Sequence, residues 1–245
     1  MSKKKISIFV IILGILLCGI GLVLMLLSDK EEPVKPKEPT VSGDEFIESL
    51  NPNDDLVQGL YYMTKGTWYA DLVDNSYYYY KSDKLLTSEF EKNHVFNIVF
   101  ERVYKKGLLS SDLTVKEEVI KAEFEEVFGT YVSYSKIDTF NNGCYYIGFD
   151  SNTNEYIYMM TNGCVPWARV FSEATAAYRY ENRIVIEESV LFTDGFDYFY
   201  DVDLTNKSSS TIIDVNDSNI AKYNYTFMYD KQLDKYYFYS IEKVK

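Results

Sequence analysis

An uninterrupted apolar stretch, residues 6–27, constrains this chain more than any other feature. Its 22 residues carry no charge, and Ser7 is its only clearly polar side chain. At ~1.5 Å per residue, a helix of this length reaches roughly 33 Å, which is enough to cross the ~30 Å hydrocarbon core of a bilayer. We therefore expect residues 6–27 to form a single transmembrane helix.

The basic residues before this stretch predict its orientation. Lys3–Lys5 stand directly before it, and basic residues close to a first span stay on the cytoplasmic side. The sequence thus indicates a signal anchor in the cell membrane, with residues 1–5 as a cytoplasmic tail and the C-terminal domain outside. A cleaved signal peptide would have a shorter apolar core of ~7–15 residues. A lipoprotein would need a small residue at the position of Leu17, before Cys18.

Residues 28–44 have the composition of a linker. Proline recurs there at every third position from 33 to 39, among Lys and Glu, which suits an extended polyproline-like spacer. We expect the rest of the chain to be one extracytoplasmic domain, residues 45–245, with a helical part (45–129) and a β-rich part (130–245).

Apolar periodicity and capping signals predict about three helices in the first part of this domain. The signals are an apolar face, two capping boxes and a glycine C-cap: Leu56, Leu60 and Met63; Ser88 with Glu91; Thr114 with Glu117; and Gly129 after Ile120, Phe124 and Phe128.

After Gly129 the apolar pattern alternates, which predicts strands joined by polar turns. Helices followed by strands indicate an α+β fold with a curved antiparallel sheet. The expected strands are 131–135, 145–149, 156–160, 173–180, 183–192, 198–203, 223–229 and 236–244.

Three stretches, behind the lysine-led anchor and the Pro/Lys/Glu linker, carry a resemblance. They are DDLVQGLYY (54–62), FEEVFG (124–129) and YNYTFMYDKQLDKYYFYSIEKV (223–244). In this order they resemble a group of uncharacterised, single-pass membrane-anchored extracytoplasmic proteins of low-GC Gram-positive-type bacteria. The group implies no activity, so no catalytic residue follows from it. The closing hairpin after helices is also similar to NTF2-like cone folds, which implies a fold and not a function.

The acidic charge of the outer domain excludes some partners. Residues 41–245 hold 19 Lys and Arg against 33 Asp and Glu, a net charge of −14. Such a surface repels phosphate backbones and anionic headgroups, so nucleic acid is not expected as a partner. The only lipid contact that we expect is the anchor itself.

No catalytic residue, cofactor or metal site is predicted. His94 is the single histidine, so no triad or two-histidine metal site can form within one chain. Acidic turns at 150–154, 201–205 and 214–218 resemble calcium loops, but each lacks the Gly and Glu that such loops need at positions 6 and 12. Asp and Asn also form ordinary turns by bonding their own backbone. Carboxylate pairs of hydrolases have no fixed sequence spacing, so they stay an open alternative.

Two cysteines in the outer domain form a candidate disulfide. Cys144 and Cys164 flank the expected hairpin 145–160, whose folding brings their positions close together, and exported proteins meet an oxidising environment. The alternative is a pair of small buried thiols.

The 24 tyrosines have two interpretations. They can form an aromatic binding surface, or their rings can pack in a β-sheet core while their hydroxyl groups contact water. If they form a surface, the contact residues are expected on three strands: Tyr178 and Tyr180, Tyr198 and Tyr200, Tyr237 and Tyr239. The sequence therefore favours a non-catalytic module that binds an envelope protein or an uncharged glycan. The alternative is an anchored carboxylate-dependent hydrolase.

The topology gives the first test. External protease on intact cells or spheroplasts should remove the domain 45–245 and leave the N-terminus intact, because Lys3–Lys5 hold it in the cytoplasm. Immunoblotting against tags at the two ends checks this result. A protected C-terminal domain with a cleaved N-terminus would contradict the orientation.

Overall fold

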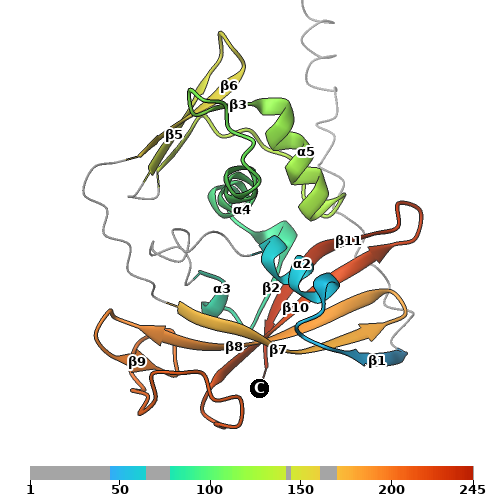
Figure 1. Cartoon of the computed structure of the whole chain (residues 1–245), viewed down its shortest axis with the longest axis vertical. Coiled ribbons are helices and arrows are strands. Elements are labelled where there is room, and N and C mark those ends of the chain that lie inside the picture. Colours follow the sequence, from blue (N-terminus) through green and yellow to red (C-terminus); the bar gives the residue numbers. More distant parts are fainter. Residues whose placement is uncertain (1–44, 65–77, 142–144, 161–169, 245) are drawn as a thin grey trace, which may run out of the picture. The chain divides into compact units, whose positions relative to one another are not determined.

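The computed structural model describes residues 45–64, 78–141, 145–160 and 170–244, which form an α+β domain with antiparallel sheets (Figure 1). The expected anchor and linker lie outside these residues, and so do Cys144 and Cys164. The described helices are α2 (Asp55–Thr64), the single turn α3 (Tyr78–Lys81), α4 (Lys92–Lys105) and α5 (Glu117–Phe128), with a 3-10 turn at Thr87–Glu89.

The larger sheet has the strand order β1-β7-β8-β10-β11-β2, and the short strand β9 also pairs with β8. Its central strands are two long hairpins, β7–β8 and β10–β11, so most of its pairing is local along the chain. The bounds are β1 (Phe46–Leu50), β2 (Lys84–Leu86), β7 (Val170–Tyr180), β8 (Arg183–Thr193), β9 (Tyr198–Phe199), β10 (Ala221–Asp230) and β11 (Lys235–Lys243).

A second, smaller sheet follows the order β3-β6-β5-β4. Its centre is the predicted hairpin at 145–160, and Phe140, Ile147 and Tyr156 lie on its buried face. The bounds are β3 (Thr114–Lys116), β4 (Thr139–Asn141), β5 (Tyr145–Asp150) and β6 (Glu155–Met160). The domain therefore has two sheets, where the sequence led us to expect one.

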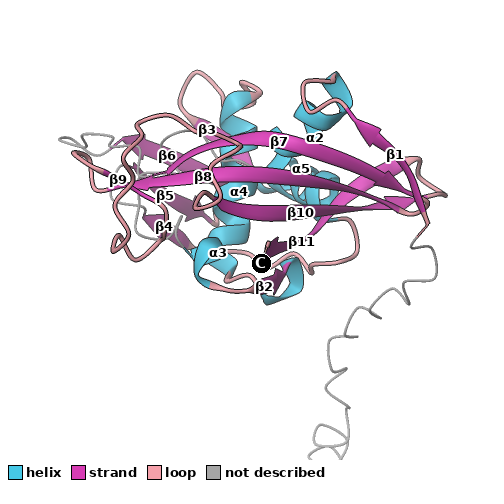
Figure 2. Ribbon diagram, turned by 90° about the horizontal axis from the view of Figure 1, so that it is seen from below, coloured by secondary structure: helices cyan, strands magenta, loops and turns pink. Residues whose placement is uncertain are grey.

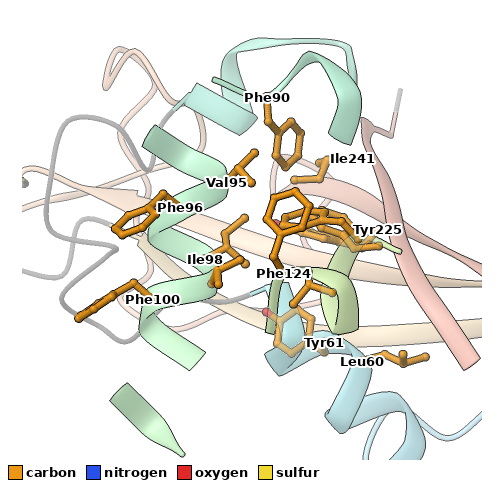
Figure 3. Close-up of a cluster of buried hydrophobic side chains, with 14 of the residues drawn as sticks. Leu60, Tyr61, Phe90, Val95, Phe96, Ile98, Phe100, Phe124, Tyr225 and Ile241 are labelled. Carbon is orange, nitrogen blue, oxygen red and sulfur yellow. The ribbon is translucent and has the colours of Figure 1, made fainter. Parts of the chain in front are cut away.

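Helix α4 lies between the two sheets, which explains why its apolar residues surround much of its circumference. Val95 and Ile98 point toward Tyr225 of the larger sheet, whereas Phe96 and Phe100 point to the opposite side (Figure 3). There Phe96 lies 5.1 Å from the ring of Tyr156 in the smaller sheet. A single helix thus packs against both sheets.

The described helices cover one face of the larger sheet and leave most of the other face uncovered, except at β11, where Gly129 at the end of α5 lies against the Tyr237 ring. Seen from below, β7, β8 and β10 run in front of the helices (Figure 2). Along β8 the residues facing the helices, among them Ile184 and Ile186, are fully buried. Val185, between them, is half-buried on the other face, which we call the open face.

Several expected elements differ from the structure. Residues 131–135 form a loop and β9 ends at Phe199, four residues before the expected end. Neither expected capping box forms: α4 begins at Lys92, and Thr114 belongs to β3. Strand β1 was not predicted, because its five residues lie at the border of a polar linker.

Gly129 ends α5 with φ +53° and ψ −124°, a positive φ as expected but with ψ outside the left-handed helical region. An added Cβ would lie 2.9 Å from the Tyr237 ring. Gly129→Ala should therefore lower the unfolding free energy by about 1–3 kcal/mol. Gly59→Ala, in α2 with nothing within 4 Å of the new methyl group, should raise it by about 0.5–1 kcal/mol. Urea unfolding followed by circular dichroism measures both, and equal effects would show that the Tyr237 contact is not as described.

Candidate functional site

A buried carboxylate lies between the helices and the larger sheet. Glu188 on β8 has an exposed fraction of 0%. The Tyr61 hydroxyl on α2 donates to its Oε1 at 2.7 Å, and the Tyr80 hydroxyl on α3 donates to its Oε2 at 3.3 Å. The Tyr61 oxygen also lies 3.1 Å from Ser172 Oγ, and the Tyr80 oxygen lies 3.4 Å from the Tyr225 hydroxyl. We call these five residues the inner network.

The tyrosines around Glu188 are held in their neutral form. Burial, together with the charge of Glu188, raises the pKa of Tyr223 and of Tyr225 above the ordinary value of a phenol. Tyr223 donates its hydroxyl hydrogen to the backbone carbonyl of Tyr80 at 3.1 Å. At physiological pH these groups are therefore hydrogen-bond donors, and they are poor nucleophiles or bases.

A second buried carboxylate lies between α4 and the smaller sheet. The Tyr145 hydroxyl is 2.8 Å from Glu101 Oε1 and 2.7 Å from Asn97 Oδ1. Burial and the Glu101 charge raise the pKa of Tyr145. The arrangement is similar to that of Glu188, because the hydroxyl of a neutral tyrosine again donates a hydrogen bond to a buried carboxylate.

Both arrangements satisfy buried charge and do not present it to a substrate. Glu188 and Glu101 are at most 3% exposed, so a substrate could reach neither without an opening of the core. A buried polar group without hydrogen bonds would be costly, and the tyrosine hydroxyls remove part of that cost. The network can therefore position α2 and α3 on the sheet, but its geometry does not prepare acid–base chemistry.

The three acidic turns bond their own backbone. Asp150 accepts from the N–H of Asn152 at 2.8 Å, and Asp214 accepts from that of Asn216 at 2.9 Å. Burial pushes the pKa of Asp201 up, but the N–H groups of Thr205 and Asn206 outweigh this and hold the pKa below its usual range. Across the part of the chain that the structure describes, no group of three or more His, Cys, Asp or Glu side chains is arranged to hold a metal ion.

The open face carries two neighbouring cross-strand rows without any carboxylate. One row runs across β1, β7, β8, β10 and β11, and the next row runs parallel to it through the same strands. The first is Phe46–Tyr180–Arg183–Met228–Tyr237, and the second is Ser49–Tyr178–Val185–Thr226–Ser240. Met228, Tyr237 and Ser240 are buried at the β10–β11 end. The accessible part of the rows is thus on β1, β7 and β8.

We call this accessible part the open-face patch: Phe46, Ser49, Tyr178, Tyr180, Arg183 and Val185. Phe46 is 52% exposed, and its ring meets that of Tyr180 edge-on at 6.0 Å. The guanidinium carbon of Arg183 lies 4.4 Å from the centroid of the Tyr180 ring, a cation–π contact. Three strands therefore contribute to one aromatic surface with a single positive charge.

The six tyrosines named from the sequence do not form one surface. Tyr178 and Tyr180 lie in the open-face patch, but Tyr198 contacts Phe171 at the other end of β7, roughly 30 Å away along the strand. The Tyr200 hydroxyl donates to Asp217 at 2.6 Å and closes a loop. Two lie near the end of α5: Tyr237 is 7% exposed beside Gly129, and Tyr239 contacts the ring of Tyr131.

Sequence reasoning missed Phe46, Arg183 and Glu188. Glu188 follows Glu187 in an apolar strand, and the alternation indicates that one of the two must face inward. That signal was present in the sequence. Phe46 gave no comparable signal, because β1 is too short to show alternation against a linker.

Comparisons with known proteins give no family for this chain: no family model, curated protein or solved structure matches it. Among the described residues, no helix is both long and apolar enough to cross a bilayer.

Neighbouring tyrosines on α2 test the inner network. Tyr61→Phe removes the donor to Glu188 and should lower the unfolding free energy by about 1–3 kcal/mol, because a bond to a buried carboxylate is lost. Tyr62→Phe, at a side chain that is 58% exposed, should change it by no more than about 0.5 kcal/mol. Urea unfolding measures both, and a Tyr61→Phe protein as stable as the wild type would show that the bond does not stabilise the fold.

Proposed function

We propose that this chain is a membrane-anchored extracytoplasmic module that binds a partner in the cell envelope without catalysing a reaction. The observation that carries the proposal is the open-face patch, an aromatic surface without Asp or Glu on a domain with a net charge of −14. Tyrosine and arginine are enriched at interfaces and at their energetic centres, and acidic residues are depleted there.

The chemistry of the interior supports binding over hydrolysis. The buried carboxylates that we describe are hydrogen-bonded to tyrosines, and the tyrosines with raised pKa values are donors at neutral pH. A hydrolase that uses Glu188 would need a route from solvent to a fully buried side chain. The hydrolase alternative is therefore supported by a carboxylate with hydroxyl groups nearby. It is not supported by any exposure of that carboxylate to a substrate.

The placement of the domain supports a partner close to the membrane. If residues 6–27 span the bilayer, the linker holds the domain within roughly 50 Å of it at ~3.1 Å per residue. Tethering raises the effective concentration of nearby partners, so a weak contact is sufficient. The proposal also includes an NTF2-like arrangement, which the long hairpins and the helices on one sheet face support.

A capture experiment tests the patch. The tagged full chain, extracted from its own membranes in mild detergent, should retain a protein or an uncharged glycan. Tyr178→Ser combined with Tyr180→Ser should reduce recovery at least about ten-fold, because interface aromatics contribute about 2 kcal/mol or more when they are central. Tyr62→Ser, at an exposed tyrosine outside the patch, is the matched control and should leave recovery unchanged.

The enzyme alternative is tested on the same preparation. We expect no turnover of peptidoglycan, peptide or ester substrates. Turnover that Glu188→Gln abolishes, in a protein that remains folded by circular dichroism, would contradict the proposal.

A further inference from the structure

We infer that the partner of the open-face patch is a second copy of this chain, and that the two copies associate through a two-fold axis that passes through the patch. This inference rests on the proposed function and names the partner of the same surface. Three features support it: the distribution of charge, the chemistry of the patch and the position of the tether in the sequence.

Charge is the main obstacle to self-association of this domain. Two domains of net charge −14 repel each other unless the surfaces that meet lack carboxylates. The patch contains no Asp or Glu. Two acids beside it are paired within their own chain: Glu48 with Arg179 at 2.7 Å, and Glu187 with Lys222 at 3.0 Å.

The acidic residue in the β7–β8 turn, beside the patch, is also paired within its own chain. Glu181, in the β7–β8 turn, lies 3.5 Å from Lys231 in the β10–β11 turn. Two copies can therefore bring these surfaces together with the carboxylates of Glu48, Glu181 and Glu187 already paired.

The patch is chemically suited to meet itself. In a two-fold contact a residue near the axis meets its own counterpart, and every contact between two different residues occurs twice. Arg183 is ordered by the Tyr180 ring, so its guanidinium is oriented before association. In the dimer it can contact the aromatic rings of the second copy, a cation–π attraction that gains strength when water leaves. Sheet faces pack about 10 Å apart, which brings rings on both faces into contact.

The position of the tether fits a two-fold axis normal to the membrane. Phe46 belongs to the patch and is the second residue after the expected linker, residues 28–44. Two copies anchored in one bilayer would therefore present the same surface on tethers of equal length. Confinement to the membrane raises their effective concentration, so an interface of a few aromatic residues is sufficient.

Photo-cross-linking in the native membrane tests the inference. Full chains with two different tags are co-expressed, with p-benzoylphenylalanine in place of Ser49, an exposed patch residue, or of Leu233, an exposed residue in the β10–β11 turn. Irradiation should give a band with both tags at about twice the 28.6 kDa chain mass from position 49. Position 233 should give at least about ten-fold less.

Charge reversal distinguishes a specific contact from misfolding. Arg183→Glu in both copies should reduce the two-tag band at least about ten-fold, because it replaces both cations that contact the aromatic rings with carboxylates and leaves two negative charges in the interface. Arg183→Glu in one copy with wild type in the other should restore much of it, because the two patches then carry opposite charges. Raising ionic strength from 0.01 to 0.15 M should strengthen the band, because the Debye length falls from about 30 to about 8 Å and domain repulsion is screened.

The outcomes separate the two proposals. A cross-link from position 49 to a different protein or to a glycan overturns the dimer and leaves the proposed function standing. No cross-link from position 49 to any molecule overturns both. A two-tag band that is equally strong from position 233, or unaffected by Arg183→Glu in both copies, overturns the dimer through this patch.

Discussion

Hydrogen bonds from Tyr61 and Tyr80 to the buried carboxylate of Glu188 hold α2 and α3 on the face of the larger sheet that carries its apolar core. A carboxylate in the core is costly unless donors surround it, and two of the donors described here come from α2 and α3. These bonds therefore tie the helical part of the chain to one face of β8. The opposite face is left for solvent or for a partner.

The same division explains the unusual tyrosine content. Inside, Tyr145, Tyr223 and Tyr225 supply large rings to the core, while their hydroxyls satisfy buried polar groups. Outside, Tyr178 and Tyr180 lie on the open face among residues without negative charge. Some tyrosines thus pack in the core and others lie on the open face, because alternate strand positions face opposite environments. The function that we propose uses only the outer set.

The alternating strands were the part of the fold that the sequence predicted best. The hairpin at 145–160 and the closing hairpin formed by β10 and β11 appear nearly as expected, because their turns and alternation agree. The α2 face was predicted less well. Leu56 is 41% exposed, and the buried face is Val57, Leu60, Tyr61 and Thr64, a second set of residues with helical spacing that also brings Tyr61 to Glu188. No local pattern encodes a bond between residues 127 positions apart.

The candidate site depends on register between distant strands, which explains why its assembly could not be predicted. Phe46 and Arg183 come together only because β1 pairs with β7. Tyr198 and Tyr200 were expected beside Tyr178 and Tyr180. The length of β7 keeps them apart, because Tyr198 contacts one end of this strand and Tyr178 and Tyr180 lie at the other. Periodicity gives the face of each strand, but not which strands become neighbours.

Hydroxyl-radical footprinting of the full chain tests the central claim most directly, because it reports side-chain exposure in the membrane and after dilution in detergent. We predict that Phe46, Tyr178 and Tyr180 are modified several-fold more slowly in the membrane, where the patch is occupied, and that Tyr62 is modified equally in both. Equal modification of the patch residues in both states, with rapid modification of Tyr61 or Tyr225, would show that the interior is the accessible site and would contradict this account.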